Sequence, residues 1–587
     1  MKTNKTAAKE KKVSLIKCLS VFDNVKLPWP MLITAFLFTI FSAWMTLTTV
    51  TFSGNAVDAS GEIPTDELFK YLFATVSSLL LMVVSGIAGS LANARIQYLV
   101  RNKLWHKIMV TKQKNFDRDG GESLVSRVTS DCEYASKFFE TLFKLTNVLI
   151  GSAMYIMQLW MINKKVATWI LVFIPISGIL GAVYSALRFV VFFKNQAKLS
   201  DSTAYLAERT KDLNLVKTCN AQKEELEKGR ELFKAQYKAQ LNIGFSTMVA
   251  TVIGTVLDVF SKVIPFAIGA VLVANGEITV GALVTVNSLF SSIAAVFGNL
   301  ILYGGEFKEA NGALARVTLF FEEEDEVLEI GDVLDDKHNE DLVFDHVKFS
   351  YTDDKQILKD LTCRIPKNKV TAVVGSNGSG KSTMFKLITR LYEPDGGAIT
   401  FGDQDASTYT LNSWRNKICL IAQGSPMMAG TIRENICYGR KDAVSDAELM
   451  EVAKLSHVYD FVKDLPDGFD SEVTAGGGNF SGGQRQCIAI ARAMMSKSEY
   501  VLMDEITSNL DVKREKDVMD AMAQLMKDRT AIIIAHSLSA IRNADYVIVL
   551  NQGKLEAEGA PSQILNKTDN YLQKMMKRRQ PMAETAQ

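Results

Sequence analysis

Long apolar runs alternate with polar segments through the first half of the chain. Six runs before residue 305 are long enough to cross about 30 Å of hydrocarbon. They are residues 31–52, 72–93, 145–162, 166–187, 245–274 and 282–303. Buried helices of a water-soluble core would account for three or four such runs with difficulty, and for six hardly at all. The pattern therefore predicts a bundle of six transmembrane helices.

Lys and Arg are unevenly distributed between the segments that join these runs. Residues 53–67 carry four acidic residues and no cation, whereas residues 94–144 and 188–244 are rich in Lys and Arg. Because cationic loops stay in the cytoplasm, we expect the first segment outside and the other two, with both termini, inside. Lys164 and Lys165 oppose this rule, but their turn is too short to outweigh the rest.

The two cytoplasmic segments hold few turn signals, so they do not resemble loops. We expect the membrane helices to continue past the bilayer and to turn back through short helices near residues 116–131 and 205–220. Residues 1–27 are basic and then amphipathic, without a signal-peptide cleavage site. They are expected to form an elbow on the cytoplasmic membrane surface.

The pattern changes after the sixth run. Residues 321–338 are acidic and are expected to form a solvated linker. Over residues 339–576 short β-branched strands alternate with helices, which is typical of an α/β domain, and residues 577–587 are expected to be disordered. The predicted fold class is an α-helical membrane bundle over residues 28–320, with long cytoplasmic extensions, followed by an α/β P-loop domain.

Composition narrows the possible partners. The chain has 66 Lys and Arg against 65 Asp and Glu, so no nucleic acid is expected as a partner. The seven Cys form no CxxC pair, which favours incidental thiols over a metal or disulfide framework. Asp258 and Lys262 lie four residues apart in the fifth run, where ionisable groups usually face the bundle interior. A structural ion pair and a substrate contact by Asp258 both stay open.

A glycine-rich sequence follows the predicted strand 370–374 and opens a helix. It reads Gly375, Ser376, Asn377, Gly378, Ser379, Gly380, Lys381, Ser382 and Thr383. This is the phosphate-loop pattern, in which glycines let backbone N–H groups converge on phosphate oxygens and the helix N-terminus favours an anion. We expect Lys381 to reach the β- and γ-phosphates of ATP and Ser382 to ligate Mg²⁺.

A second strand, residues 500–503, ends in Asp504 and Glu505. Beside a phosphate loop in a parallel sheet, Asp504 would hold Mg²⁺ and Glu505 would activate the attacking water. Two acids after a strand often form only a solvated turn, but the phosphate loop favours the catalytic interpretation. Between the two motifs, a further helix opens with Ser481, Gly482, Gly483 and Gln484, where Ser481 alone would be a good N-cap.

The order and spacing of these motifs resemble the ATP-binding cassette (ABC) transporter superfamily, in particular exporters with six helices and one cassette per chain. The resemblance covers nearly the whole chain. It implies that Ser481 to Gln484 form the signature motif, which binds the γ-phosphate held by the opposite cassette. It also implies an adenine-stacking, a glutamine-loop, a dimer-contact and a switch residue; these are Tyr351, Gln423, Asp511 and His536. Gln423 would join Ser382 and Asp504 at Mg²⁺.

In the membrane half, residues 115–131 resemble the exporters' first coupling segment and residues 275–282 their short fifth–sixth turn. Some positions depart from the family pattern. These are Phe480 for Leu, Met428 for Phe, Ser508-Asn509 for Ser-Ala, and an altered segment 474–478. None removes a catalytic group, so only the fine tuning of coupling is affected.

The resemblance implies ATP-driven export by alternating access in a dimer. The expected partners are a second copy of the chain, the lipid bilayer and a transported peptide, lipid or amphipathic small molecule, with a heterodimer as the other possibility. The expected location is the plasma membrane of a bacterium. The alternative is an ATP-gated channel or a regulatory ABC protein with little transport. A channel would be expected to have a degraded catalytic centre, whereas Glu505, His536 and the signature are intact.

Overall fold

The structure of the protein is a computed structural model. It describes residues 14–23, 25–59, 65–168, 201–334, 340–352, 355–402, 404–504, 512–535 and 538–565, and positions 179, 191, 194–195 and 198–199. The chain forms two compact units, which we describe separately. The helical unit comprises residues 1–109 and 122–323, and the cassette unit comprises residues 110–121 and 324–587.

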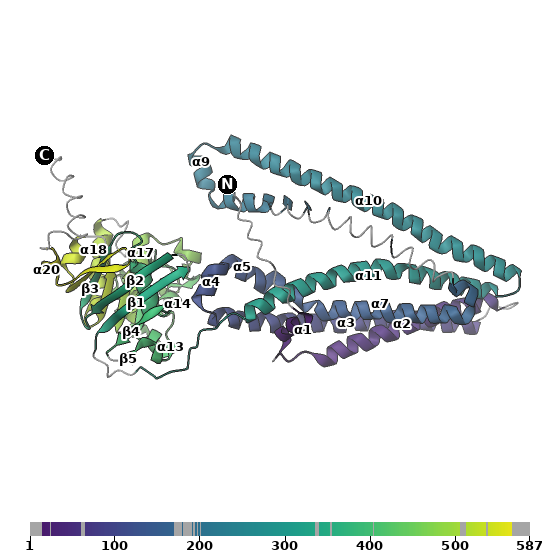
Figure 1. Ribbon diagram of the computed structural model, residues 1–587, viewed down its shortest axis with the longest axis horizontal. Helices are drawn as coiled ribbons and strands as arrows, with labels where there is room; N and C mark the ends of the chain where they lie inside the picture. The colour runs from purple at the N-terminus through teal and green to yellow at the C-terminus, as the bar shows by residue number, and fades with distance from the viewer. Residues whose placement is uncertain are drawn as a thin grey trace. The chain divides into compact units, whose positions relative to one another are not determined.

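The helical unit is dominated by long helices, of which α10 diverges from α11 with distance from the turn that joins them (Figure 1). Its elements in chain order are α1 (Leu15–Cys18), η1 (Leu19–Phe22), α2 (Trp29–Asp58), α3 (Thr65–Val110), α5 (Gly121–Ser126), the π-helical turn η2 (Arg127–Asp131), α6 (Cys132–Ser136), α7 (Phe138–Ile162), α9 (Leu213–Thr218), α10 (Gln222–Ala274) and α11 (Val280–Phe321).

Four helices among the described residues are long and apolar enough to cross a membrane. They are Trp29–Asp58, Thr65–Val110, Ser123–Ile162 and Val280–Phe321. In the first three, no more than 11% of the most apolar stretch is buried. Helices that expose so much apolar surface are suited to lipid, where every backbone group is satisfied within the helix.

The predicted runs 31–52, 72–93, 145–162 and 282–303 lie in these helices. The run 166–187 falls mostly outside the described residues. The run 245–274 lies in α10, whose last part, Lys262–Ala274, is a shorter apolar helix. Lys262 is exposed on α10, and the side chain of Asp258 is outside the described set. The hypothesis about Asp258 therefore stays a prediction.

Helix α11 packs against α7, α2 and α10. At one end of the bundle its backbone meets α2 without intervening side chains, because a Cβ added to Gly281 would lie 2.0 Å from the carbonyl oxygen of Gly54. Asp58, the last residue of α2, accepts hydrogen bonds from Gly281 N at 2.6 Å and Thr279 Oγ1 at 2.5 Å. These contacts satisfy donors at the start of α11 and join the two helices.

The N-terminal elbow is held at the other end of the bundle. Its residues Cys18, Val21 and Phe22 are buried in one hydrophobic cluster with residues of α3, α7 and α11. Ile16, in the same segment, is 82% exposed. The described part of this segment therefore packs some of its apolar side chains against protein and leaves another exposed.

The cassette unit contains three sheets. A six-stranded sheet has the order β12-β11-β3-β10-β9-β6, parallel except for β12; a four-stranded antiparallel sheet has the order β2-β1-β4-β5; and β7 pairs with β8. The strands are β1 (Leu342–Thr352), β2 (Lys355–Ile365), β3 (Val370–Gly375), β4 (Gly396–Phe401), β5 (Gln404–Asp405), β6 (Ile418–Ile421), β7 (Gly430–Thr431), β8 (Glu472–Val473), β9 (Tyr500–Asp504), β10 (Thr530–Ile534), β11 (Tyr546–Asn551) and β12 (Lys554–Gly559).

The helices of this unit enclose two large hydrophobic cores. They are α4 (Gln113–Asp119), α12 (Lys381–Ile388), η3 (Ala406–Thr408), α13 (Leu411–Asn416), α14 (Ile432–Ile436), α15 (Asp446–Leu455), α16 (Tyr459–Val462), η4 (Gly468–Asp470), η5 (Ala475–Gly477), α17 (Gly482–Met495), α18 (Val512–Met526), α19 (Leu538–Arg542) and α20 (Pro561–Leu565). Helix α12 packs into the core between the two larger sheets, and α17 packs into the second core with α14, α15 and α18.

The connecting segments contain short helices near both expected ranges: α4, α5 and η2 near residues 116–131, and α9 within residues 205–220. Gly120, whose φ is +77°, ends α4. The linker 321–338 was expected to be solvated, and this is wrong for Glu326. Its side chain is 13% exposed and forms two hydrogen bonds of 2.7 and 2.8 Å with Arg415. Arg415 of the cassette thus fixes this position of the acidic run by two hydrogen bonds.

Candidate functional site

The phosphate loop joins β3 to α12, and packing leaves little room for a side chain at two of its glycines. A Cβ on Gly375 would lie 2.3 Å from the carbonyl oxygen of Leu550, and one on Gly380 would lie 2.5 Å from Leu358 Cδ2. Gly380 also has φ of +107° and forms the N-cap of α12 without a side-chain hydrogen bond. The first N–H groups of α12 therefore have no side-chain cap, as an anion-binding helix terminus requires.

Two side chains of the loop fit a phosphate ligand. Lys381 is 7% exposed, and its Nζ folds back to donate to the carbonyl oxygens of Gly375 at 3.0 Å and Ser376 at 3.1 Å. Ser379 is 1% exposed, and its Oγ has no hydrogen-bond partner among the described residues. A buried hydroxyl without a partner costs about 1–3 kcal/mol, so an incoming phosphate oxygen would be favoured here.

The strand register brings the predicted metal ligands to one edge of the sheet. Ile534 of β10 pairs with both Val373 of β3 and Asp504 of β9. Ile421 of β6 pairs with Met503, and Gln423 follows two residues later, exposed in a turn. The carboxyl ends of these parallel strands, which is where α/β sheets bind ligands, therefore share an edge with the phosphate loop.

Oxygen donors of this kind suit Mg²⁺. Ser382 is exposed at the start of α12, and Asp504 is half-buried at the end of β9. The described part of the chain has no cluster of three or more His, Cys, Asp or Glu. A metal ion bound here would take further ligands from nucleotide phosphates and water, as Mg²⁺ does in nucleotide sites.

An aromatic cluster surrounds Tyr351. Its ring centroid lies 4.9 Å from that of Phe349 and 5.2 Å from that of Tyr392, with all three rings edge-to-face. The Tyr351 hydroxyl is 3.2 Å from Thr383 Oγ1 in the phosphate loop, and Lys386 Nζ lies 5.0 Å above the Tyr351 ring. The predicted adenine-stacking residue is thus held against α12.

The same cluster contacts α4 through Tyr392. The Tyr392 hydroxyl donates to Asp117 Oδ2 at 2.6 Å, and Lys386 Nζ lies 3.8 Å from that oxygen. Burial, followed by the hydrogen bond to Asp117, raises the pKa of the Tyr392 phenol, so the phenol remains a donor at neutral pH. Tyr392 and Lys386 were missed in the sequence, where neither belongs to a recognised motif.

The signature sequence begins α17. Ser481 is its N-cap and forms a capping box, since Ser481 Oγ accepts from Gln484 N at 3.3 Å and Ser481 N donates to Gln484 Oε1 at 2.9 Å. Gly482 is exposed, and an added Cβ would meet nothing within 4 Å. Phe480, the departure from the usual Leu, is buried and packs near Phe461.

Three predicted residues lie outside the described part of the chain. They are Glu505, Asp511 and His536. Glu505 directly follows Asp504, and His536 comes two residues after the end of β10. Their roles stay predictions.

A phosphate loop at the edge of a parallel sheet, joined in one chain to long apolar helices, defines a membrane protein with a P-loop nucleotide-binding domain. Residues 358–508 match the family described as ABC transporter, and residues 31–296 match the family described as ABC transporter transmembrane region. The chain belongs to the ABC transporter family, as an exporter half-transporter with an N-terminal transmembrane domain fused to one cassette. It is a multi-pass membrane protein whose ATPase drives export.

Two bacterial relatives match this chain over more than four fifths of its length. The multidrug resistance ABC transporter ATP-binding and permease protein of Lactococcus lactis subsp. cremoris is 30% identical over 502 residues, covering 84% of this chain and 83% of the relative. A putative multidrug export ATP-binding/permease protein of Staphylococcus aureus is 29% identical over 497 residues, covering 81% and 83%. The solved structure of a bacterial Atm1-family ABC exporter with ATP bound has a TM-score of 0.81 at 24% identity, covering 95% and 99%, which shows the fold.

Proposed function

We propose that two copies of this chain form a homodimer that exports an amphipathic substrate by alternating access, with each ATP site shared between the two cassettes. The carrying observation is that the phosphate loop and the signature sequence are anchored in separate hydrophobic cores. Met384 and Phe385 of α12 belong to one core, and Ile488 and Ile490 of α17 belong to the other. This supports an arrangement in which the two motifs bind different nucleotides.

At each shared site the residues have distinct roles. Lys381 and the N-terminus of α12 bind the phosphates, and Tyr351 stacks on adenine. Glu505 deprotonates the attacking water, and His536 touches the γ-phosphate. Ser481 to Gln484 of the opposite chain close the site, with Asp511 at the dimer contact. Ser382, Gln423 and Asp504 would hold Mg²⁺, which neutralises phosphate charge when bound.

The topology follows from the charge distribution. Both termini and the segments 94–144 and 188–244 lie in the cytoplasm, and residues 53–67 lie outside, because Lys and Arg are retained inside. The bacterial relatives support a location in the plasma membrane of a bacterium. The names of these relatives also support a small amphipathic molecule as the substrate.

A mixed dimer tests the shared site. One chain carries Lys381→Ala and the other carries Ser481→Arg, and each variant alone should fail to trap ATP. In a shared arrangement one site of the mixed dimer carries both lesions and the other carries neither, so trapping should return at about half the wild-type amount, one of two sites. No trapping by a correctly assembled mixed dimer would refute the shared site.

Two controls keep this result interpretable. Loss of the Ser481 cap costs about 1 kcal/mol, so Gly482→Asp provides a second signature variant at a position where a side chain meets nothing within 4 Å.

Transport is then measured as ATP-dependent accumulation in inverted vesicles. An ATP-dependent ion conductance without accumulation would instead identify a channel.

A further inference from the structure

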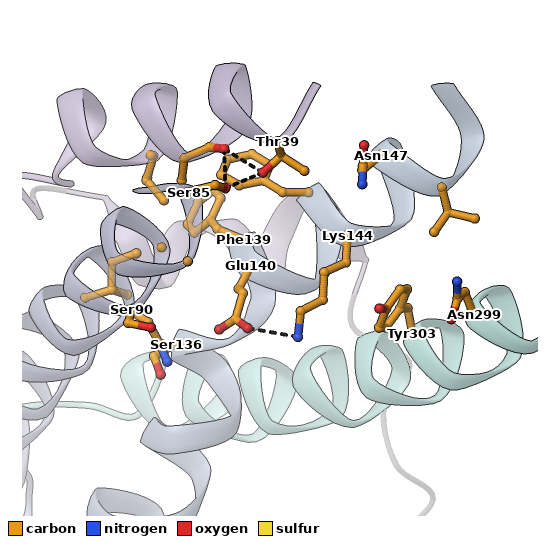
Figure 2. Close-up of a pocket in the computed structure, with 18 residues that line it drawn as sticks. Thr39, Ser85, Ser90, Ser136, Phe139, Glu140, Lys144, Asn147, Asn299 and Tyr303 are labelled. Atoms are coloured by element: carbon orange, nitrogen blue, oxygen red, sulfur yellow. Dashed lines mark hydrogen bonds and ion pairs between the residues drawn. The ribbon is translucent and has the colours of Figure 1, made fainter. Parts of the chain in front are cut away.

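A cavity of about 310 Å³ lies inside the helical unit, between α2, α3, α7 and α11. This volume is at the lower end of the range for sites that bind small organic molecules. Leu32, Phe139 and Phe143 provide apolar lining, and Glu140 and Lys144 are its charged lining residues. Figure 2 shows Glu140 and Lys144 of α7 meeting within the cavity, with Tyr303 of α11 beside them. The cavity is therefore apolar with one charged region.

The cavity lies toward one end of the bundle. Asn299 on its wall comes 19 residues after the first residue of α11, Val280, which is about 29 Å along the helix. Leu32 on the opposite wall is near the start of α2 at Trp29. In the proposed topology this is the depth of the inner leaflet, from which a membrane-soluble molecule would enter.

The charged region has a surplus of negative charge. Lys144 Nζ is 2.9 Å from Glu140 Oε1 and 3.6 Å from Oε2 of Glu306, a residue outside the cavity lining. Two carboxylates thus share one ammonium, and these three groups together carry a net charge of −1. The side chains of the lining residues Glu140 and Lys144 are 36% and 38% exposed, so they are accessible to a ligand. An anion would be repelled here, whereas a cation would be attracted.

Other groups in the cavity also favour a ligand that donates hydrogen bonds and carries a positive charge. The Oδ1 atoms of Asn93 and Asn147 are buried and have no hydrogen-bond partner among the described residues. Lys144 Nζ lies over the Tyr303 ring, 5.5 Å from the ring centroid, which is the geometry in which aromatic faces bind cations. Carboxylates, amide oxygens and a ring face all complement an ammonium group.

We propose that this cavity binds an organic ammonium ion with an apolar body, and that Lys144 occupies the ammonium position when no ligand is bound. The ligand's ammonium displaces Lys144 from Glu140, the nearby charge of Glu306 adds to the attraction, and the ligand's apolar body contacts Phe139 and Phe143. Each chain has its own cavity, so the dimer has two. This inference rests on the proposed export function, because it names the substrate class of that exporter.

The test uses the full-length protein in nanodiscs and measures equilibrium binding of two fluorescent probes, 1-naphthylmethylammonium and the neutral 1-naphthalenemethanol, corrected for empty nanodiscs. We expect Glu140→Gln to weaken ammonium binding at least 10-fold and to leave alcohol binding within 2-fold. Lys144→Met should tighten ammonium binding at least 3-fold, because it removes the competing cation. A purely structural ion pair would instead make both variants weaker.

The chain offers a matched control. Lys137 and Glu133 form an ion pair of the same spacing and the same 2.9 Å distance outside the cavity lining, so Glu133→Gln and Lys137→Met should leave both probes unaffected. Alcohol binding within 2-fold of wild type verifies that the helical unit is folded, and ATP affinity within 2-fold verifies the cassette. Weaker ammonium binding in Lys144→Met, or equal wild-type affinity for the two probes, would overturn the inference. Specific ammonium binding without ATP-dependent accumulation would overturn export and leave the cavity assignment standing.

Discussion

Removing the hydroxyl of Tyr392 should loosen α4 from the cassette. This hydroxyl donates to Asp117 at 2.6 Å, and a buried hydrogen bond to a charged group contributes about 1.5–3 kcal/mol. The Asp117 side chain is 41% exposed, so solvent reduces the expected value to about 1–1.5 kcal/mol. The ion pair with Lys386 is retained in Tyr392→Phe. The opening equilibrium of α4 should therefore shift about 5- to 12-fold.

Hydrogen exchange of the full-length protein measures this opening directly, because amides of a docked helix exchange only when it opens. The peptide containing residues 113–119 should exchange about 5- to 12-fold faster in Tyr392→Phe. Asp117→Ala removes the same hydrogen bond together with the ion pair to Lys386, so it should accelerate exchange at least as much, and adding Tyr392→Phe to it should cause no further acceleration. Tyr409→Phe is the control, because that hydroxyl donates to Gln404 within the cassette.

Either of two results would contradict the docking of α4 by this hydrogen bond. Unchanged exchange of residues 113–119 in Tyr392→Phe would mean that the hydrogen bond does not hold α4. Multiplicative effects in the double variant would mean that Asp117 and Tyr392 act independently. ATP affinity, measured in parallel, separates loss of docking from damage to the aromatic cluster around Tyr351.

Two further predictions concern the helical unit. Gly281→Ala should lower the thermal unfolding midpoint in detergent, because its Cβ would lie 2.0 Å from the Gly54 carbonyl oxygen and overpacking costs about 1–3 kcal/mol. Gly298→Ala on the same helix, where an added Cβ meets nothing within 4 Å, is the control and should be neutral or slightly stabilising. Equal unfolding midpoints for the two variants would contradict the close contact. Cys219 is an exposed thiol in the segment 188–244. If the proposed topology holds, it should react with a membrane-impermeant maleimide in inverted vesicles and not in intact cells, with Cys219→Ser as the blank; labelling from the outside would reverse the proposed topology.

The sequence predicted those elements that are determined by residues close together in the chain. Four apolar runs match long helices because length and hydropathy alone decide what can span a bilayer. The phosphate loop was found for a similar reason, since its glycines and Lys381 are contiguous. The end of α4 at Gly120 also had a local signal, because glycine is common just after a helix.

Features that depend on distant partners could not be predicted. Glu326 belongs to an acidic run that is typical of a linker, and its partner Arg415 is 89 residues away. Tyr392 and Asp117 are 275 residues apart. The residues that line the cavity are spread over several helices, each of which contributes only some of them. In the sequence, Glu140 and Lys144 look like any exposed i,i+4 pair. Only packing shows that these side chains share one space.

The two places where the chain passes between its units are tied together within the cassette unit. Thr111 forms an antiparallel bridge with Asp325, the Lys112 N–H donates to the Glu324 carbonyl at 3.3 Å, and the Glu326 N–H donates to the Val110 carbonyl at 2.6 Å. A cassette unit that is to be moved as a whole therefore consists of two separate stretches of the chain, residues 110–121 and 324–587. A cassette grafted onto another exporter would need residues 110–121 transplanted with it, and one residue inserted before Glu324 would shift this pairing out of register.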